Sequence, residues 1–560
     1  MLHLPPELVI SVLQHVSLST LSSLLCASRE WAQFFEVNRS TIYHNAAVFH
    51  GFIPSTSIVY SELETVLSRR ALTGVNDWRS FCSAQIHIRK AWRGGASSRV
   101  TAHRCTGNEV HRIKVDEQRG FSITTSTQGG LLIVDLHEDQ VLWSLPEKYV
   151  REYAHCEYGA GYLIFDRAGG NKEVWRVADD FDSSQDASMF SPPDDRQSDI
   201  STFAADMHGF PFLTRGHFKP WAVLRPPAFT RAFRFVFPTL LAATHDCLFI
   251  WGVPTGELVQ VIRNIQISPD GVGSESLLGD LNYVEISARS DGHAFICGHN
   301  SLRVFSRTSG RCVLDILSSQ VSYGNTVYSF VTDGGHLHDW RSNSVLKPQP
   351  IHNLIVSAAT NGRRLLDEFI AVHVSACGSH IAALLASSRL IIIPFFERAI
   401  SGAVDIRDIA LDIQLGSPVS VGKYLAFENG RVAVATGTGL FVVELNLNAR
   451  TSDSVERPPI SIHRAAWFNN PVSLNCVTCL QMSDTGIFFN WDTPSENDTI
   501  REYQDDNLNP DAGYELLFSR SLTDEQQLFR LPNGDNIIQL FEPDGVRRTS
   551  MLFSIDFVPA

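Results

Sequence analysis

Cysteine, histidine and glycine motifs at three places in this 560-residue sequence use residue types found in metal and phosphate sites. Cys476 and Cys479 form a lone CxxC in a segment that we expect to be a strand. Side chains alternate along a strand, so thiols three residues apart would face opposite sides and do not predict a zinc site. His336 and His338 would share one side of a strand, which fits a loop edge or a hydrogen-bonded core better than a metal site. Gly437-Thr438-Gly439 precedes a strand and not a helix, so we expect a hairpin turn there and not a phosphate cradle.

The remaining catalytic signals are missing, since the sequence holds neither a nucleophile elbow nor a P-loop. We therefore expect no catalytic residue, no cofactor and no metal. An active site assembled from several distant segments would leave no local motif, so an enzyme stays open as an alternative.

Composition is that of a globular protein, at 44% hydrophobic and 19% charged residues. The most apolar run, residues 390–396, is far too short to span a membrane and contains a proline. The N-terminus lacks the features of a signal peptide, and the ten cysteines stand almost singly. Reduced thiols are expected, in a cytoplasmic or nuclear protein that does not bind membranes.

The net charge of −14 is concentrated in two segments, residues 179–199 and 496–515, each with a net charge of −6. The composition of both segments predicts solvated loop insertions, and we expect the first to be disordered. The alternative is that either segment has a regulatory role. No basic stripe appears elsewhere, so we expect no nucleic-acid partner.

The first 35 residues predict three short apolar helices. Pro5-Pro6 fixes φ where a helix can begin, and the apolar residues that follow repeat at helical spacing. Ser19 or Thr20 can cap a second helix, and Ser28 a third that carries Trp31. Helices this short cannot bury all of their apolar surface among themselves, so part of it needs a partner.

This stretch resembles an F-box, whose pattern is an LPxEL opening, a hydrophobic helix, a Leu-rich helix and a Trp in the third helix. The matching residues are Leu4, Pro5, Glu7, Leu8, Leu13, Leu21, Leu24, Leu25 and Trp31. The sequence departs from the pattern at Glu30, where a basic residue is common. The alternative is an ordinary N-terminal cap that packs on the rest of the chain.

The F-box resemblance implies docking on the Skp adaptor of a cullin ubiquitin ligase. The adaptor interface that it implies consists of Leu4, Pro5, Leu8, Leu13, Leu24, Leu25 and Trp31. Some of these side chains must form the core of the helices themselves, and the sequence does not divide them.

From about residue 108 onward, short runs of β-branched and aromatic residues alternate with turn residues. The clearest unit, residues 283–316, has four strands joined by hairpin-length loops, which is the content of one propeller blade. Further copies begin near residues 109, 162, 240, 369, 424 and 476.

These repeats resemble divergent WD-type blades, although the Trp-Asp dipeptide occurs only at Trp491-Asp492. The resemblance implies a β-propeller of seven blades, or of eight if the wide gap after Trp175 holds another. The competing fold is a pair of β-sandwiches, which the regular repetition without a central linker disfavours. The expected third-strand markers are Trp175, Trp251, Phe305, Trp340, Phe395, Val442 and Trp491.

The expected organisation is multidomain: a small all-α F-box, a helical linker and an all-β propeller. The expected ranges are 1–48 for the F-box, 49–107 for the linker with helices at 61–70 and 76–92, and 108–560 for the propeller with its acidic insertions. We expect the ring to close through Val110–Val115 at its start and Asn536–Phe541 and Met551–Val558 at its end, because closure removes open strand edges.

The function that follows from the two resemblances is that of a non-catalytic substrate receptor of a Skp–cullin–F-box ubiquitin ligase. The F-box would bind the adaptor, and through it a cullin, while the propeller would bind an unidentified target protein. A scaffold acting outside a ligase and a propeller enzyme are the alternatives. WD-type receptors often use arginines to hold phosphorylated targets. Arg289, Arg303, Arg341 and Arg389 lie in or near blade loops, but the sequence does not show that they converge and fits ordinary exposed residues better.

Overall fold

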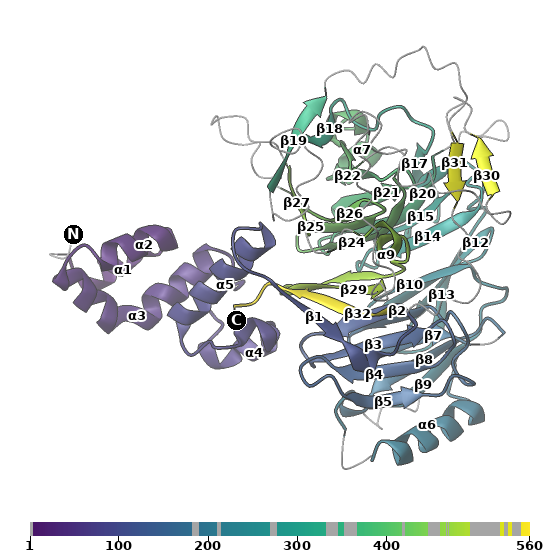
Figure 1. Ribbon diagram of the computed structural model, residues 1–560, viewed down its shortest axis with the longest axis horizontal. Helices are drawn as coiled ribbons and strands as arrows, with labels where there is room; N and C mark the ends of the chain where they lie inside the picture. Colours follow the sequence, from purple (N-terminus) through teal and green to yellow (C-terminus); the bar gives the residue numbers. More distant parts are fainter. Residues whose placement is uncertain are drawn as a thin grey trace, which may run out of the picture.

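A helical arm (residues 4–98) precedes a ring of antiparallel sheets in the computed structural model of the chain (Figure 1). The structure describes residues 4–167, 169–181, 190–209, 214–268, 277–331, 345–351, 367–416, 420–445, 460–465, 468, 470–492, 527–530, 536–539 and 550–559. No helix in these ranges is long and apolar enough to cross a membrane.

The helices of the arm begin where capping residues satisfy free backbone N–H groups. These elements are α1 (Pro6–Leu13), α2 (Leu18–Leu25), α3 (Arg29–Phe49), η1 (Tyr60–Glu62), α4 (Leu63–Val66), η2 (Arg70–Leu72) and α5 (Trp78–Trp92). Pro6 occupies the first position of α1, and Ser28 accepts a hydrogen bond from the Trp31 N–H at the start of α3, both as predicted. The cap of α2 is Ser17, not Ser19 or Thr20, because its hydroxyl accepts the Thr20 N–H. The helix predicted over 61–70 is broken at Leu67, whose backbone is extended.

The arm is one packed unit, because α1, α2 and α3 share a hydrophobic core with α5. Val9, Leu13, Phe35, Trp78 and Phe81 are buried together in it. The helices predicted to form the linker therefore pack on the three N-terminal helices.

Seven four-stranded blades follow, counted over the described residues, and no eighth blade is found among them. Blade 1 holds β2 (Val110–Asp116), β3 (Phe121–Ser126), β4 (Leu131–Asp135) and β5 (Val141–Leu145). Blade 2 holds β6 (Cys156–Gly159), β7 (Tyr162–Asp166), β8 (Lys172–Val177) and β9 (Phe218–Leu224). Blade 3 holds β10 (Ala232–Val236), β11 (Thr239–Ala243), β12 (Cys247–Gly252) and β13 (Glu257–Arg263). Blade 4 holds β14 (Leu281–Ile286), β15 (His293–Gly298), β16 (Ser301–Ser306) and β17 (Cys312–Leu317).

The last three blades come from the second half of the chain. Blade 5 holds β20 (Phe369–Val374), β21 (His380–Leu385), β22 (Arg389–Pro394) and β23 (Leu411–Gln414). Blade 6 holds β24 (Gly422–Glu428), β25 (Arg431–Thr436), β26 (Gly439–Leu445) and β27 (Ile460–Arg464). Blade 7 holds β28 (Leu480–Met482), β29 (Gly486–Asp492), β32 (Ser550–Asp556) and β1 (Arg99–His103).

Ring closure differs from the prediction. The N-terminal strand of blade 7 is β1, which pairs with β32, whereas Val110–Val115 lies in β2, the innermost strand of blade 1. The predicted C-terminal strand 551–558 is confirmed in β32. β31 (Asn536–Gln539) pairs with β30 (Gln527–Arg530) in a separate hairpin instead of entering the ring. β1 also shows that strand structure begins inside the range predicted to be a helical linker.

Insertions explain why the predicted repeat markers drift. The gap after Trp175 holds α6 (Asp195–Met207) between β8 and β9, and Trp491 lies on the second strand of its blade. β18 (Val327–Val331) and β19 (Val345–Ile351) join blades 5 and 6 into one ten-stranded sheet. Trp340 lies outside the described residues. The short elements η3 (Arg104–Thr106), η4 (Ala178–Asp180), α7 (Glu397–Ile400), α8 (Ile406–Ile409) and α9 (Pro471–Asn475) lie in other connections.

The acidic segment 179–199 is only partly a loop. Its last residues begin α6, where Asp194 accepts the Gln197 N–H at 3.0 Å and pairs with Arg167 at 2.5 Å. Gln197 is buried and donates to the carbonyl of Val174. The expectation of disorder is therefore wrong for residues 190–199 and for 179–181, where Asp180 pairs with Arg119 at 2.6 Å. Residues 182–189 and the second acidic segment, 496–515, lie outside the described residues.

Candidate functional surfaces

An apolar stripe of Leu4, Leu8 and Val12 is exposed on and just before α1 (hereafter the arm stripe), with 46%, 53% and 42% of each side chain accessible. The spacing of four residues places them on one side of the helix, while Val9 and Leu13 face the core of the arm. Covering a half-exposed hydrophobic side chain with the apolar surface of a partner lowers the free energy of the complex. The arm stripe is therefore suited to binding another apolar surface.

The seven residues predicted for adaptor binding divide into three groups in the structure. Leu4, Pro5 and Leu8 are exposed, while Leu24, Leu25 and Trp31 are half-buried against the core of the arm. Leu13 is 1% exposed, so it packs in that core and offers no binding surface. Val12 is exposed beside Leu8 but was not among the predicted adaptor residues, although its position four residues later places it on the same side of the helix.

The far end of the arm is built into the propeller. Trp92 packs against Phe557 with ring centroids 4.1 Å apart and donates its indole N–H to the Asp484 carbonyl at 3.0 Å. Ile88 and Trp92 share a hydrophobic core with blades 6 and 7. This packing holds the arm stripe at a fixed distance from the ring.

The arm contacts one end of the ring, which we call the arm face. Successive strands of a blade run in opposite directions, so the turns between first and second strands all lie at that end. Glu117, Asn429 and Asp484 mark these turns in blades 1, 6 and 7, and all three blades contact the arm or its immediate surroundings.

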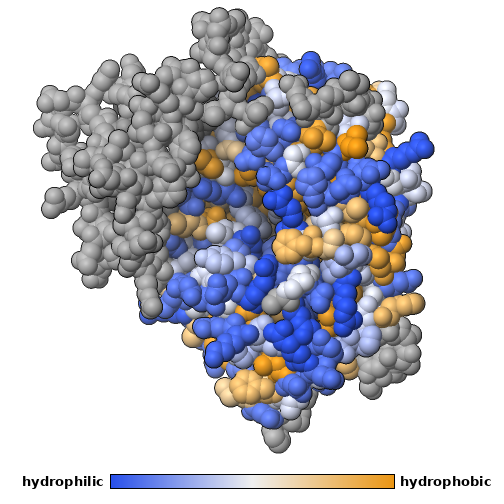
Figure 2. Space-filling view, turned by 90° about the vertical axis from the view of Figure 1, so that its right-hand side faces the viewer, coloured by the Kyte–Doolittle hydropathy of each residue, from blue (hydrophilic) through white to orange (hydrophobic). Residues whose placement is uncertain are grey.

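The opposite end, the open face, is where loops connect one blade to the next. Figure 2 views the molecule from the side away from the arm and shows hydrophobic residues standing among hydrophilic ones. Exposed apolar side chains of these connecting loops are Tyr153, Phe229, Ile267, Leu277 and Val421. Tyr153 also has a left-handed backbone, with φ of 52°, which is uncommon for a non-glycine residue and costs free energy.

Ion pairs and one histidine hydrogen bond join the innermost strands of blades 1 to 5 (the axial ion-pair chain). Glu157 lies 2.9 Å from Lys114 and 2.9 Å from Arg234. Arg234 also pairs with Glu285 at 3.1 Å, and His373 Nδ1 donates to Glu285 at 2.7 Å. Both carboxylates are thus used in contacts between blades.

Electrostatics favours the charged form of Glu157 despite its burial. Burial alone would raise the pKa of Glu157, but Lys114, Arg234 and the hydrogen-bonded His155 hold that pKa well below its ordinary value. His373 behaves oppositely, since burial lowers its pKa and leaves the imidazole neutral. The axial ion-pair chain therefore joins blades 2, 3 and 4 through Glu157, Arg234 and Glu285, whose pKa shifts favour their charged forms, and it reaches blade 5 through the hydrogen bond of His373.

The four arginines proposed from the sequence do not form a common site where they are described. Arg303 pairs with Asp315 at 3.1 Å and Arg389 with Asp412 at 2.5 Å, each inside its own blade. Arg289 pairs with the neighbouring exposed Asp291. Arg341 lies outside the described residues. Each of the three described arginines thus pairs with a carboxylate near it in the sequence, and no converging set is found among them.

The described cysteine and glycine motifs have structural roles in the fold. Cys476 and Cys479 precede β28, so the strand predicted over them is wrong; burial raises the pKa of Cys479 to about 11. Gly437-Thr438-Gly439 forms the predicted hairpin between β25 and β26, where Thr436 pairs with Gly439. His336 and His338 lie outside the described residues. In the described ranges, no group of three or more His, Cys, Asp or Glu side chains could hold a metal ion.

No protein-family model matches the chain, and no curated protein matches it. Several solved structures resemble it at low identity. KlHsv2, with its loop 6CD replaced by a Gly-Ser linker, has 10% identity and a TM-score of 0.33 over 61% of this chain and 81% of its own. The RRP9 WD40 repeats have 8% identity and a TM-score of 0.39 over 70% of this chain and 89% of theirs. The Cps50 (Swd1) β-propeller domain of Myceliophteria thermophila has 11% identity and a TM-score of 0.40 over 70% of this chain and 96% of its own.

Proposed function

We propose that this protein is a non-catalytic receptor subunit of a Skp–cullin–F-box ubiquitin ligase. The arm stripe would bind the Skp adaptor, and through it a cullin, while the propeller would bind the target protein. The observation that carries the proposal is a stripe of Leu4, Leu8 and Val12 that stays exposed although Val9 and Leu13 of the same helix are buried in the core of the arm. The F-box resemblance, which includes Leu4 and Leu8, supplies the identity of the partner.

The open face is the proposed target surface. The arm occupies the other end of the ring, so a target on the open face would not compete with the arm for space. Tyr153 and Phe229 offer exposed aromatic rings there, a residue type that dominates binding energy at protein interfaces.

Adaptor binding is tested with Leu8→Asp, compared with Val66→Asp. Val66 lies on α4, near the propeller end of the arm, and is 44% exposed, so it controls for adding a charge to an exposed apolar site (Figure 1). A charge buried without a partner costs several kcal/mol, so Leu8→Asp should abolish pull-down of the Skp adaptor while the protein stays folded. Undiminished capture by Leu8→Asp would remove the arm stripe from the interface.

Target binding is tested on partners captured with the proteasome blocked, using Phe229→Asp and Leu8→Asp side by side. Phe229→Asp should lose the target and keep the adaptor, and Leu8→Asp should do the reverse. Ubiquitin transfer to the captured target should require both surfaces. Retained target binding without any ubiquitin transfer, even in the unmodified protein, would favour the alternative of a scaffold outside a ligase.

A further inference from the structure

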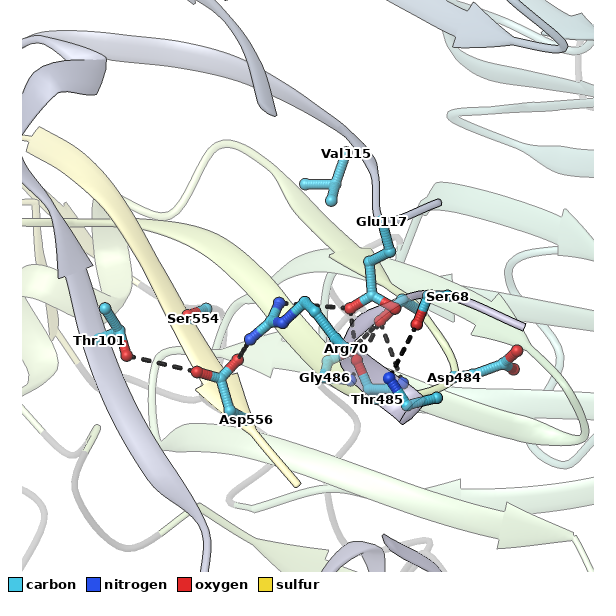
Figure 3. A network of polar contacts seen from close by, with 12 residues as sticks. Ser68, Arg70, Thr101, Val115, Glu117, Asp484, Thr485, Gly486, Ser554 and Asp556 are labelled. Carbon is cyan, nitrogen blue, oxygen red and sulfur yellow. Dashed lines mark hydrogen bonds and ion pairs between the residues drawn. The ribbon is translucent and has the colours of Figure 1, made fainter. Parts of the chain in front are cut away.

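Arg70, on the short helix η2 of the arm, reaches two buried carboxylates of the ring (Figure 3). It forms ion pairs with Asp556, the last residue of β32, and with Glu117, in the turn after β2, at 3.3 Å from the latter. Asp556 belongs to blade 7 and Glu117 adjoins blade 1. One side chain of the arm therefore bridges the last and first blades of the ring.

Asp556 lies at the point where the ring is closed. β1 and β32 come from opposite ends of the propeller sequence and pair as antiparallel strands, with Arg99 opposite Asp556. Thr101 of β1 donates its hydroxyl to Asp556 at 3.3 Å, and the Arg99 guanidinium lies 3.8 Å away. The Asp556 carboxylate of β32 therefore contacts both Arg70 of the arm and the side chains of β1.

The charge of Arg70 is needed because both carboxylates are removed from water, with Asp556 2% and Glu117 8% exposed. Thr485 donates to Glu117 at 2.5 Å, but it brings no charge. The neighbouring Asp484 adds negative potential, and Arg99, the other cation beside Asp556, is largely exposed. Burial raises the pKa of Glu117 even beside Arg70, so the charge at stake without Arg70 is mainly that of Asp556. Leaving a buried charge without its principal cation is strongly destabilising.

We propose that Arg70 couples docking of the arm to closure of the ring, so that the β1–β32 seam and the arm open and close as one unit. The coupling does not depend on which partner binds the arm stripe. Its consequence is that the relative position of the two binding surfaces is fixed only while the ring is closed.

The test compares amide hydrogen exchange in Arg70→Gln and Arg93→Gln. Arg93 also ties the arm to the ring, through Glu444 at 2.6 Å, but its side chain is largely exposed, so its loss should change little. Arg70→Gln should speed exchange about tenfold or more in η2, β1 and β32 together, while β7 and β8 keep their protection. Faster exchange in η2 alone would show a simple tether and overturn the coupling, as would equal effects of both substitutions.

Charge compensation is tested in the triple variant Arg70→Gln, Glu117→Gln and Asp556→Asn. This variant removes the two carboxylates that Arg70 neutralises, so protection of β1 and β32 should return toward that of the unmodified protein. If Arg70→Gln alone does not fold, recovery of folding in the triple variant tests the same charge compensation. Failure of the triple variant to recover seam protection relative to Arg70→Gln would overturn the proposal.

Discussion

The role of a side chain in this protein depends on its contacts and not on its residue type. Leu8 and Leu13 are both leucines of α1, yet one is exposed and the other sits in the core of the arm. Glu157 is a buried carboxylate that stays charged because two cations flank it. The same residue type therefore serves binding, core packing or blade-to-blade contact, depending on its neighbours.

Replacing Glu157 with Gln tests the axial ion-pair chain at the residue scale. Lys114 and Arg234 would each lose a carboxylate partner, and we expect unfolding free energy at pH 7 to fall by about 3–5 kcal/mol. Asp291→Asn, which removes the partner of the exposed Arg289, is the control and should change stability little. Chemical denaturation measures both, and equal stability of Glu157→Gln and the unmodified protein would contradict the role of Glu157.

The pH dependence of stability follows from the same group. The folded-state pKa of Glu157 lies below its ordinary value of 4.5, so the folded protein binds fewer protons than the unfolded chain in that range. The stabilisation is present above pH 4.5 and is lost as the pH falls below it. Thermal melting between pH 7 and pH 3 should show a shallower loss on acidification in Glu157→Gln than in the unmodified protein.

At the scale of elements, insertions shape the ring without breaking its repeat. α6 occupies the connection between β8 and β9, and the β18–β19 hairpin covers the outer strands of blades 5 and 6. α6 depends on Asp194, which caps its N-terminus and pairs with Arg167. The acidic segment thus has a folding role at its end.

Asp194→Ala should lower the unfolding free energy by about 1–2 kcal/mol, the usual cost of losing an N-cap. Asp195→Ala, in the exposed first turn of the same helix, is the matched control and should cost less. Deleting residues 181–198 should destabilise the protein further, since it removes the cap and the buried Gln197. Unchanged thermal melting of Asp194→Ala would mean that α6 does not rely on this cap.

At the scale of the whole molecule, the ring and the arm form one structure. Each pair of neighbouring blades shares a hydrophobic core, and the core between blades 6 and 7 also takes in Trp92 of the arm. Blade 7 depends on strands from both ends of the propeller. Damage at either end of the propeller sequence should therefore affect the whole ring.

Ending the chain before Ser550 removes β32 and should abolish cooperative folding of the propeller. β1 would lose the strand it pairs with, and β29 would be left paired with β28, which opens blade 7 and exposes strand edges. A chain that ends at Phe557 keeps β32 and serves as the control. Thermal melting and size-exclusion chromatography should separate the two, and a shared melting transition would mean that the ring closes without β32.

Local patterns in the sequence determined the helices, most strands and the propeller repeat. The effects of Pro6 and Ser28, and of the alternation of strands and turns, act on the neighbouring backbone. They can therefore be predicted from short segments of the sequence. The arm stripe could be predicted only in part, because helical spacing groups Leu8 with Val12 but does not show which side of the helix is buried.

Tertiary structure alone decided the long-range partners. Arg70 and Asp556, or β1 and β32, are separated by hundreds of residues, and no local periodicity records which distant carboxylate a cation will meet. Ring closure through β1 was mispredicted because both β1 and β2 have strand-forming sequences, and only the packing of blade 7 selects between them. The sequence by itself determined what each segment can form, while the closed ring determined which surfaces remain free to bind, since burial is a property of the whole fold.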